Sequence, residues 1–486
     1  MTYDVLIIGS GFGALVSANL LSQLGQRVLV LEQGSQAGGC LQGYCRGDYT
    51  FDTGFHYVGG LDEGGGLRRV FDALQMDALP WQRLDSEGYD RISVGGREFR
   101  LHNGYDNFAK SLAMDFPHDR EALLGYSRLL RETERHLYDC IDPQATDPDQ
   151  ALQPMATSAY GYLAEHFSDP LLVDVLAAAS ARLELRRESL PLFTLSHVVS
   201  GYVRSSWRLK GGGALLAQRL TERLRSLGGQ LLTRSRVVGL HAEGGRLTEA
   251  ECSNGERYRA KVFLSDIHPA LTLKLVDESL LPVYYRRRIA RLANTWGALT
   301  VSLVLKPGQL GYFNYNRYVY PTANVWEHSG VMLSACVPDQ GDSLRQLDLI
   351  TLTDNREWQP WSQTALGRRG DDYRMKKEQM ADRCVAVAET VVPSLSRMIE
   401  RRYVSTPQTW RSYTSTPQGS AYGIRKDYHS PLLTMVSTRT PIQNLLLTGQ
   451  SLCVHGLQGV AVTALQSCAH IVGKEAVWNW LNNKHL

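Results

Sequence analysis

The sequence lacks long apolar runs and is poor in cysteine, and each absence excludes a class of protein. No run of 18 apolar residues occurs, so no segment is predicted to span a bilayer. The eight cysteines are scattered through 486 residues without a CxxC pair. This spacing argues against zinc ribbons and dithiol redox motifs, and we expect no metal site. Scattered cysteines are typical of a reducing compartment.

An excess of charge of either sign is also missing. The net charge is +3, which is too balanced for an electrostatic nucleic-acid binder. Apolar residues make up 43% of the chain, an ordinary globular composition that excludes a disordered chain. The first residues, MTYDVLIIGS, enter a strand pattern without a secretory signal, so we expect a cytoplasmic protein.

The first forty residues predict a strand–helix–strand unit. Tyr3 to Ile8 and Val28 to Leu31 are short apolar runs of the kind found in buried parallel strands. Apolar residues recur between them at helical spacing, and Gly25 then ends the helix. This order predicts a βαβ unit.

The turn of this unit, Gly9-Ser-Gly-Phe-Gly-Ala14, is a GxGxxA form of the dinucleotide fingerprint. Gly9 permits the tight turn, Gly11 lets a pyrophosphate approach the backbone, and Ala14 allows close packing of the helix. Glu32 ends the second strand, where a carboxylate accepts hydrogen bonds from a ribose diol. An acidic residue there disfavours the 2′-phosphate of NADP.

The next segments favour FAD over NAD. Gly38-Gly39 and the Gly-rich stretch 51–60 replace the second βαβ unit of a nicotinamide enzyme, as expected where backbone lies along an extended cofactor. Gly64–Gly66 and Gly211–Gly213 precede helices but lack flanking strand pairs, so we predict no separate NAD domain. The electron donor or acceptor stays open.

These strings resemble the phytoene desaturase, carotenoid isomerase and retinol saturase superfamily of FAD enzymes. The matching strings are DVLIIGSGFGALVSANLL, AGGC and FDTGFHYVGG, and the last is most similar to the retinol saturase branch, with Phe55 in an aliphatic position. The segment from Asn444 to Gln450 and the apolar helix Val460 to Val472 resemble the second flavin segment of the family. Gln450 departs from the acidic residue of many relatives.

The resemblance implies an α/β fold with two domains. A discontinuous Rossmann-type FAD-binding domain, like that of glutathione reductase, is expected over residues 1–75, 205–275 and 420–486. An inserted α+β substrate domain is expected over residues 76–204 and 276–419. The residues expected to bind the cofactor are Gly9, Gly11, Phe12, Gly13, Ala14, Glu32, Gln33, Gly38, Gly39, Cys40, Gly54, Phe55, His56, Val237, Gly449, Gln450, Gly459 and Val460.

Sequence patterns predict further elements. An amphipathic helix is expected over residues 119–138 and another over residues 214–227. Residues 230–237 are predicted to form a strand pair about Thr233. Residues 237–252 are predicted to form a hairpin that turns at Gly244-Gly245. Residues 298–305 are typical of a strand facing a hydrophobic site.

His56 and Tyr57 are the candidate catalytic residues. His56 titrates near neutral pH and lies in the segment expected beside the flavin, but a histidine that only shapes the loop or positions the cofactor is the favoured alternative. The same alternative holds for Tyr57. We interpret Asp52 as a cap of the turn at Thr53-Gly54 rather than as a base.

Other polar and reactive residues receive mainly structural interpretations. His268 is interpreted as structural, whereas His455 could lie near the flavin pyrimidine. Cys40 and Cys45 are expected to be buried thiols. Residues 281–292 combine arginines with aromatic residues, so peripheral membrane contact and a solvated basic helix face are both open.

The resemblance therefore implies an FAD-dependent oxidoreductase acting on CH–CH groups. It would saturate, desaturate or isomerise a C=C bond in a hydrophobic small molecule, such as a retinoid-like or carotenoid-like polyene. One alternative is an amine-oxidase-like flavoprotein acting on a C–N bond. Another is a non-catalytic protein that binds FAD or lipid.

Overall fold

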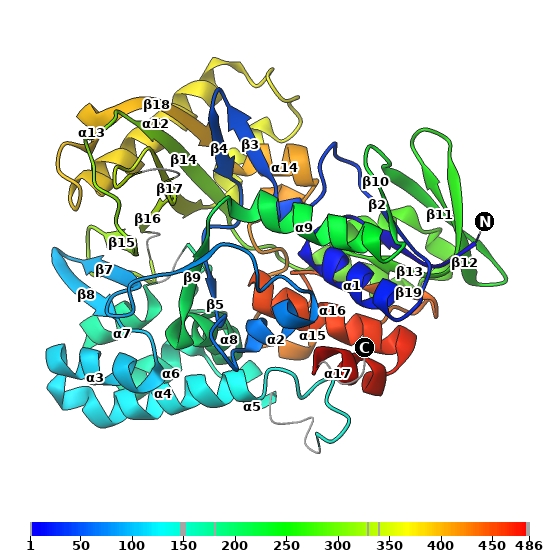
Figure 1. Cartoon of the computed structure of the whole chain (residues 1–486), viewed down its shortest axis with the longest axis horizontal. Helices are drawn as coiled ribbons and strands as arrows, with labels where there is room; N and C mark the ends of the chain where they lie inside the picture. The colour runs from blue at the N-terminus through cyan, green and yellow to red at the C-terminus, as the bar shows by residue number, and fades with distance from the viewer. Residues whose placement is uncertain (1, 146–151, 179–180, 328–329, 339–340, 483–486) are drawn as a thin grey trace.

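The computed structural model describes residues 2–145, 152–178, 181–327, 330–338 and 341–482. Within them, two seven-stranded sheets form the framework, one near the N-terminus and the other on the far side of the molecule (Figure 1). Two smaller sheets, of two and three strands, complete the described strands. The predicted α/β class is confirmed.

The βαβ unit predicted from the first forty residues is present. Strand β1 (Thr2–Ile8) pairs in parallel with β2 (Val28–Leu31), and helix α1 (Phe12–Gln23) connects them. Both strands are almost entirely buried, as their continuous apolar sequences require. Helix α1 is buried along nearly its whole length, because α9 and α16 pack against it.

The first sheet combines segments that are far apart in the chain. Its order is β10-β2-β1-β13-β12-β11, and β19 pairs in parallel with β13. The hairpin predicted at Gly244-Gly245 joins β11 to β12, but the strand pair predicted about Thr233 divides into β10 and β11, which are not paired with each other. The remaining strands are β10 (Gln230–Leu232), β11 (Val237–Glu243), β12 (Arg246–Cys252), β13 (Arg257–Ser265) and β19 (Leu445–Leu447).

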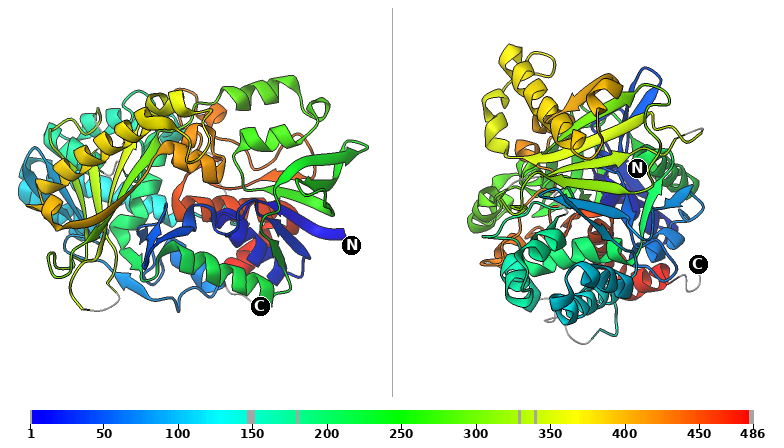
Figure 2. Two further views of the ribbon diagram at one scale, coloured as in Figure 1. Left: turned by 90° about the horizontal axis from the view of Figure 1, so that it is seen from above. Right: turned by 90° about the vertical axis from the view of Figure 1, so that its left-hand side faces the viewer.

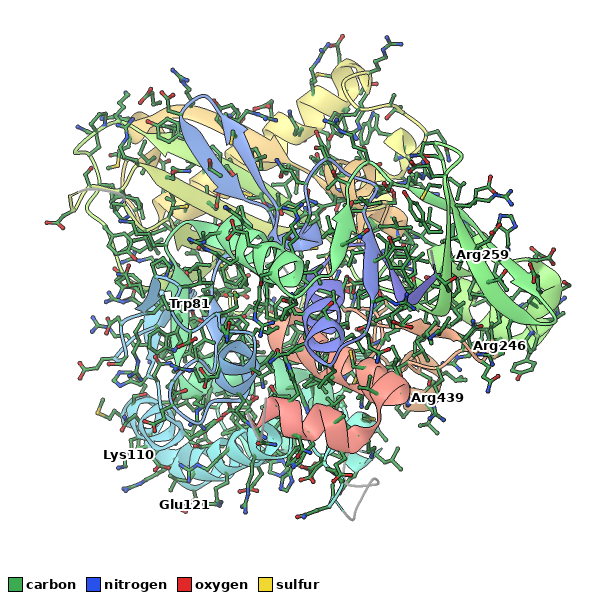
Figure 3. The ribbon with its side chains drawn as sticks, turned by 45° about the vertical axis from the view of Figure 1, so that its right-hand side comes forward. Trp81, Lys110, Glu121, Arg246, Arg259 and Arg439 are labelled. Carbon is green, nitrogen blue, oxygen red and sulfur yellow. The ribbon has the colours of Figure 1, made fainter. Side chains whose placement is uncertain are left out.

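Helices from both ends of the chain cover this sheet. They share one apolar core with α1, in which the buried side chains of α9 and α16 meet. These helices are α2 (Gly66–Ala73), α9 (Gly212–Ser226), α16 (Gly456–Val472) and α17 (Lys474–Leu481). Figure 3 labels Arg246 at the start of β12 and Arg259 on β13, on the side of the molecule where the hairpin of β11 and β12 projects.

The second sheet takes strands from both predicted insertions. Its order is β18-β14-β17-β16-β15-β7-β8, and its pairs are antiparallel except that β15 runs parallel to β7. The long helix α12 (Gly370–Glu389) covers one face (Figure 2). The strands are β7 (Asp90–Val94), β8 (Arg97–Leu101), β14 (Gly297–Leu305), β15 (Asn316–Tyr320), β16 (Val331–Ala335), β17 (Gln346–Thr353) and β18 (Ile399–Ser405).

A group of helices lies beside the second sheet, at the lower left of Figure 1. Lys110 and Glu121 mark its outer edge in Figure 3. The helix predicted over residues 119–138 is α4. The group comprises α3 (Tyr105–Asp115), α4 (Arg120–Arg135), α5 (Leu152–Met155), α6 (Ala159–His166), α7 (Pro170–Ala177) and α8 (Leu192–Arg204).

Short elements connect the two halves of the molecule. The hairpin of β3 and β4 follows the nucleotide motif in sequence but packs on the second sheet, where Tyr44 Oη donates to Ser302 Oγ at 2.9 Å. The short strands are β3 (Gly43–Arg46), β4 (Tyr49–Asp52), β5 (Val58–Gly59), β6 (Trp81–Arg83) and β9 (Ser206–Leu209).

The remaining helices are single turns or short segments at the surface and around the cavity described below. The α-helices are α10 (Pro269–Thr272), α11 (Val283–Arg291), α13 (Leu395–Met398), α14 (Pro407–Thr414) and α15 (Pro431–Thr434). The 3-10 helices are η1 (Gly39–Leu41), η2 (Pro117–Asp119), η3 (Leu273–Leu275), η4 (Glu278–Leu280), η5 (Asn355–Trp361) and η6 (Pro417–Gly419).

The strands of the first sheet come from all three ranges predicted for the FAD domain, and those of the second from both predicted insertions. The domain boundaries themselves stay a prediction. No helix in the described part of the chain has both the length and the apolar sequence needed to cross a membrane.

The contact between β5 and α8 generates a stability prediction. A methyl group added at Gly59 would collide with the backbone of Gly201 and Tyr202 in α8, and backbone cannot move aside as a flexible side chain can. We expect Gly59→Ala to lower the free energy of unfolding by about 1–3 kcal/mol. Thermal unfolding followed by circular dichroism measures this.

Gly125→Ala is the matched control, because Gly125 lies inside α4 and only the end of the Arg128 side chain is near its added methyl group. It should stabilise the protein by about 0.5–1 kcal/mol. Equal unfolding temperatures for the two variants would contradict the predicted collision.

Candidate functional site

A cavity of about 410 Å³ extends from the first sheet to the second. One end is formed where the parallel strands β1, β2 and β13 terminate, near Gly9, Glu32 and Asp266. The other end is formed by Ala298 and Thr300 of β14 and by other residues of the second sheet and its connections. Crevices at the carboxyl ends of parallel strands are the usual ligand sites of such sheets.

The glycines of the GxGxxA turn form a narrow cradle at the first end. Gly9 has a φ of +91°, a conformation that side chains disfavour, and its N–H donates to Leu31 O at 2.9 Å. A methyl group on Gly11 would lie 2.5 Å from Asp266 Oδ2. The backbone of the turn therefore closely approaches the Asp266 carboxylate at the N-terminus of α1, where N–H groups and the helix dipole favour an anion.

Glu32 is held in a fixed position at the end of β2. Its Oε2 accepts from Ser10 Oγ at 2.5 Å and its Oε1 accepts from the Gly34 N–H at 2.6 Å. The side chain is buried but lines the cavity. It is thus oriented before any ligand binds.

Asp266 lies at the same edge, directly after β13, and sequence reasoning assigned it no role. Burial raises the pKa of Asp266 to about 7. The nearby Glu32 carboxylate also raises this pKa, whereas hydrogen bonds from the N–H groups of Ala14 and Gly11 lower it. The position could have been found from the sequence, because a residue that follows a strand parallel to β1 must lie at the same sheet edge.

The C-terminal segment closes this end of the cavity. The Thr448 N–H donates to Ser265 O at 2.8 Å, which brings Gly449 and Gln450 beside the cradle. Gln450 Nε2 donates to Ala421 O at 3.3 Å. Val460 of α16 also lines the cavity.

His56 lies at the wall between the nucleotide end and the second sheet. Its Nδ1 is 3.7 Å from Asp348 Oδ2 of β17, and its side chain is 14% exposed. Burial lowers the pKa of His56 to about 4, and the positive charge of Arg208 acts in the same direction. The imidazole is therefore neutral at pH 7.

Tyr57, the neighbour of His56, does not line the cavity. Its hydroxyl donates to Asp90 Oδ2 at 3.0 Å and lies 2.7 Å from Tyr318 Oη. Arg182 stands over its ring and pairs with Asp90 at 3.2 Å. The two adjacent residues are thus directed into different environments, and only His56 can reach a ligand.

Most of the predicted cofactor residues meet at the cavity. Ala14, Phe55 and Gly459 do not line it: Ala14 is fully buried in α1, Phe55 packs edge-on against Trp81, and Gly459 packs against the backbone of Val454. The residues that line it are Gly9, Gly11, Phe12, Gly13, Glu32, Gln33, Gly38, Gly39, Cys40, Gly54, His56, Val237, Gly449, Gln450 and Val460. That they hold FAD stays a prediction.

Two sequence interpretations need correction. Asp52 does not cap the turn at Thr53-Gly54, because its Oδ1 accepts from the Gly213 N–H at 2.7 Å at the start of α9. Cys45 is exposed on the surface hairpin and is not a buried thiol. Cys40 does line the cavity, and burial raises the pKa of its thiol to about 11.

The two other histidines considered above make mainly structural contacts. His268 lines the cavity; its Nδ1 accepts from the Ala270 N–H at 3.2 Å, and its Nε2 donates to Asn294 Oδ1 at 2.8 Å. Its structural role stays a prediction. His455 Nε2 donates to Arg182 O at 2.8 Å. His455 does not line the cavity, although the next residue, Gly456, does.

Several lining residues of the second end were missed by sequence reasoning. Trp410 and Tyr422 supply aromatic surface, and Ile350 of β17 adds an aliphatic side chain. Tyr413 lies instead at the nucleotide end, where its carbonyl oxygen accepts from Gln33 Nε2 at 3.3 Å. The apolar strand around Leu299 was the available signal, because alternate residues of a strand share one face. In the described ranges, no group of three or more His, Cys, Asp or Glu side chains could hold a metal ion.

Comparison with known proteins places this geometry in a family. A family model described as flavin containing amine oxidoreductase matches residues 15–472. The chain is 26% identical over 537 residues to all-trans-retinol 13,14-reductase of Homo sapiens, covering 99% of this chain and 87% of that protein. It is 24% identical over 518 residues to the chloroplastic prolycopene isomerase of Arabidopsis thaliana, covering 97% and 83% respectively.

Solved structures share the fold. Putrescine oxidase bound to putrescine superposes with a TM-score of 0.66 at 16% identity, covering 97% of this chain and 99% of that chain. Cyclohexylamine oxidase from Brevibacterium oxydans IH-35A gives a TM-score of 0.62 at 16% identity, covering 99% of each chain.

These findings confirm the predicted FAD cofactor and the predicted resemblance to retinol saturases and carotenoid isomerases. The chain is an FAD-dependent oxidoreductase of that branch, and it belongs to the flavin-containing amine oxidoreductase family.

Proposed function

We propose that this enzyme saturates, desaturates or isomerises a C=C bond in a hydrophobic, conjugated substrate. The observation that carries the proposal is the continuity of one cavity from a nucleotide cradle to an apolar wall on the second sheet. The relatives support it, since they are named for retinol reduction and prolycopene isomerisation.

The residues present fit FAD. The glycine cradle and the dipole at the start of α1 suit its pyrophosphate, for which the N–H groups of Gly11 and Ala14 would exchange the Asp266 carboxylate. Glu32, held by Ser10 and Gly34, would accept hydrogen bonds from the adenosine ribose. Val237 would contact the adenine, and Gln450 would donate to the cofactor without adding negative charge. When bound, FAD supplies hydride-transfer chemistry to the cavity.

The second end of the cavity suits an apolar substrate. Ala298, Ile350 and Trp410 would exclude water from the reacting double bond and orient it. His56 offers a titratable side chain at this end that reaches the cavity, and it is our candidate for proton transfer beside the hydride.

Amine oxidation is the second candidate, favoured by the structural likeness to putrescine and cyclohexylamine oxidases. A cationic amine would be stabilised by a carboxylate near the reacting end. Among the described lining residues, the carboxylates are Glu32 and Asp266, and both lie at the nucleotide end. The lining of the second sheet therefore favours the neutral polyene.

Anaerobic absorption spectroscopy of the yellow protein tests the function. We expect a retinoid or carotenoid to bleach the oxidised flavin or to reoxidise protein reduced beforehand with dithionite, and a prolycopene-like cis-polyene to be isomerised. Primary amines should leave the spectrum unchanged. Bleaching by amines with peroxide release would contradict the proposal, and a flavin that dithionite cannot reduce would favour the non-catalytic alternative.

Asp266 should make FAD affinity depend on pH. Because its pKa is raised to about 7, the carboxyl is neutral below that pH and negative above it, where it would repel the FAD pyrophosphate. We expect FAD to bind about tenfold more weakly at about pH 8.5 than at about pH 6. Asp266→Asn should remove this dependence, and quenching of flavin fluorescence measures the dissociation constant.

Asp174→Asn is a matched control, because it neutralises another buried carboxyl, in α7, that does not line the cavity. It should keep the wild-type pH dependence. An unchanged pH dependence in Asp266→Asn would show that a different group titrates.

We further propose that the protein contacts anionic membranes through the α11–α15 patch, which consists of Val283, Tyr284, Leu432 and Leu433. All four side chains are at least half exposed, and Tyr284 reaches 74%. The two helices are held together by Arg288, whose guanidinium donates to the carbonyl oxygens of Leu433 and Met435, both at 3.2 Å.

Basic residues accompany these apolar side chains. Arg287 and Arg291 are exposed on α11, one turn apart. Apolar side chains beside arginines are the combination that binds the interface of a bilayer with anionic lipid. Such a surface would let the enzyme collect an apolar substrate from a membrane.

Flotation with liposomes tests the patch. The holoenzyme should float with vesicles that contain phosphatidylserine, and the double variant Tyr284→Glu and Leu432→Glu should float at least about tenfold less. High salt should weaken the wild-type interaction. Met375→Glu, a change at an exposed methionine of α12, is the control and should float like the wild type. Flotation of the double variant at the wild-type level would exclude the patch.

A further inference from the structure

A buried carboxyl that no lysine or arginine neutralises lies behind the cavity wall. Asp348, on β17, is 1% exposed. Ser302 of the neighbouring strand β14 donates a hydrogen bond that lowers the pKa of Asp348, but among the described residues the basic side chain that lies within 4 Å of the carboxyl is His56. A buried carboxylate that no cation neutralises is strongly disfavoured, so a group of this kind requires either a proton or a nearby cation.

His56 is the group best placed to provide that proton. Its Nδ1 lies 3.7 Å from Asp348 Oδ2, slightly beyond hydrogen-bond range. A small rotation of either side chain would close the gap. His56 also lines the cavity, whereas Asp348 does not, so the pair links a ligand-facing nitrogen to a buried carboxyl.

The surroundings favour neutral forms of both partners. Burial raises the pKa of Asp348 to about 7, and the Asp52 carboxyl adds to this. Burial and Arg208 lower the pKa of His56 to about 4. Near pH 7 the proton therefore lies on the Asp348 carboxyl, from which the neutral ring of His56 can receive it.

The other titratable groups that face the pair come from several elements. Asp52 ends β4, Arg208 lies on β9, and Tyr44 lies on β3. The thiol of Cys336, after β16, is buried against Asp348, and burial raises its pKa well above the usual range. The Arg208 guanidinium donates to Asn316 Oδ1 at 2.8 Å, so it is directed toward Asn316 and does not neutralise Asp348.

We propose that His56 exchanges a proton with the substrate carbon and that Asp348 is its positioning residue, which holds the ring and returns the proton. This inference rests on the proposed function. In the reducing direction, one carbon of the C=C gains H⁺ from His56 and its neighbour gains a hydride with two electrons from the reduced flavin. One π bond is thereby replaced by two C–H bonds. The H⁺ that His56 gives to the carbon is the proton that the ring received from the Asp348 carboxyl, and the pair takes up one proton from solvent before the next turnover.

The first experiment needs no substrate. Infrared spectra of the holoenzyme should show a protonated carboxyl band that titrates near neutral pH, shifts in D₂O and is lost in Asp348→Asn. In His56→Gln, the carboxylate loses its potential cation, so we expect the titration midpoint of this band to rise by about one pH unit or more. Because His56→Gln leaves Asp348 in place, it still tests the pair if the Asp348→Asn variant does not fold.

His197→Gln is the control, because His197 is a buried neutral histidine of α8 that donates to Phe193 O and does not line the cavity. It should leave the midpoint unchanged. An unshifted midpoint in His56→Gln would overturn the pair, whatever the substrate is.

The second experiment measures single turnovers of dithionite-reduced enzyme with a polyene. Asp348→Asn, His56→Gln and His56→Ala should retain FAD but react at least about tenfold more slowly, with substrate affinity unchanged. The double variant should be no slower than the slower single variant, because both residues act in one step. In D₂O, the wild type should place one deuterium in the product.

The outcomes of the two experiments are separable. The wild-type rate and pH profile in Asp348→Asn would overturn the positioning role, and the wild-type rate in His56→Ala would remove His56 from the reaction. Asp174→Asn should react like the wild type. If no polyene reacts with the wild type, the proposed function fails. The shift of the infrared titration midpoint in His56→Gln then still shows whether His56 and Asp348 share a proton.

Discussion

The parallel pairing of β13 with β1 on one side and β19 on the other is the constraint on which the site depends. It brings the N-terminal, middle and C-terminal segments of the chain into one sheet. Since parallel strands end at the same edge, Gly9, Asp266 and Gly449 meet there although they are hundreds of residues apart in sequence. Loss of that pairing would separate the cradle at the N-terminus of α1 from the segment that closes it.

The same constraint leaves the intervening segments free to build the second sheet. Both insertions contribute strands to it, and β14 lies between β17 and the edge strand β18. Because the β3–β4 hairpin packs on this sheet while following directly from the nucleotide motif, the two halves are tied together beside the cavity. The protein therefore combines a nucleotide cradle on the first sheet with a second end of the cavity that is formed by the inserted sheet.

Burial explains the chemistry available at the wall. Of the buried charged groups near the cavity, Arg182 is paired with Asp90, whereas His56 and Asp348 have pKa values shifted toward their neutral forms. Neutral groups that share a proton suit an apolar substrate better than fixed charges do, because a fixed charge would have to be desolvated each time the substrate entered. The polyene proposal and the proton-sharing pair thus follow from the same lack of solvent.

The sequence alone determined the features that depend on local pattern. The GxGxxA turn, the strands that flank it and the hairpin at Gly244-Gly245 each follow from the periodicity and turn chemistry of neighbouring residues. Only the tertiary structure decided which side chains share the cavity. Asp348 gives no local signal, and His56 and Tyr57 are adjacent in sequence yet enter different environments. Their roles depend on strand pairing between distant segments, which no spacing within a single segment encodes.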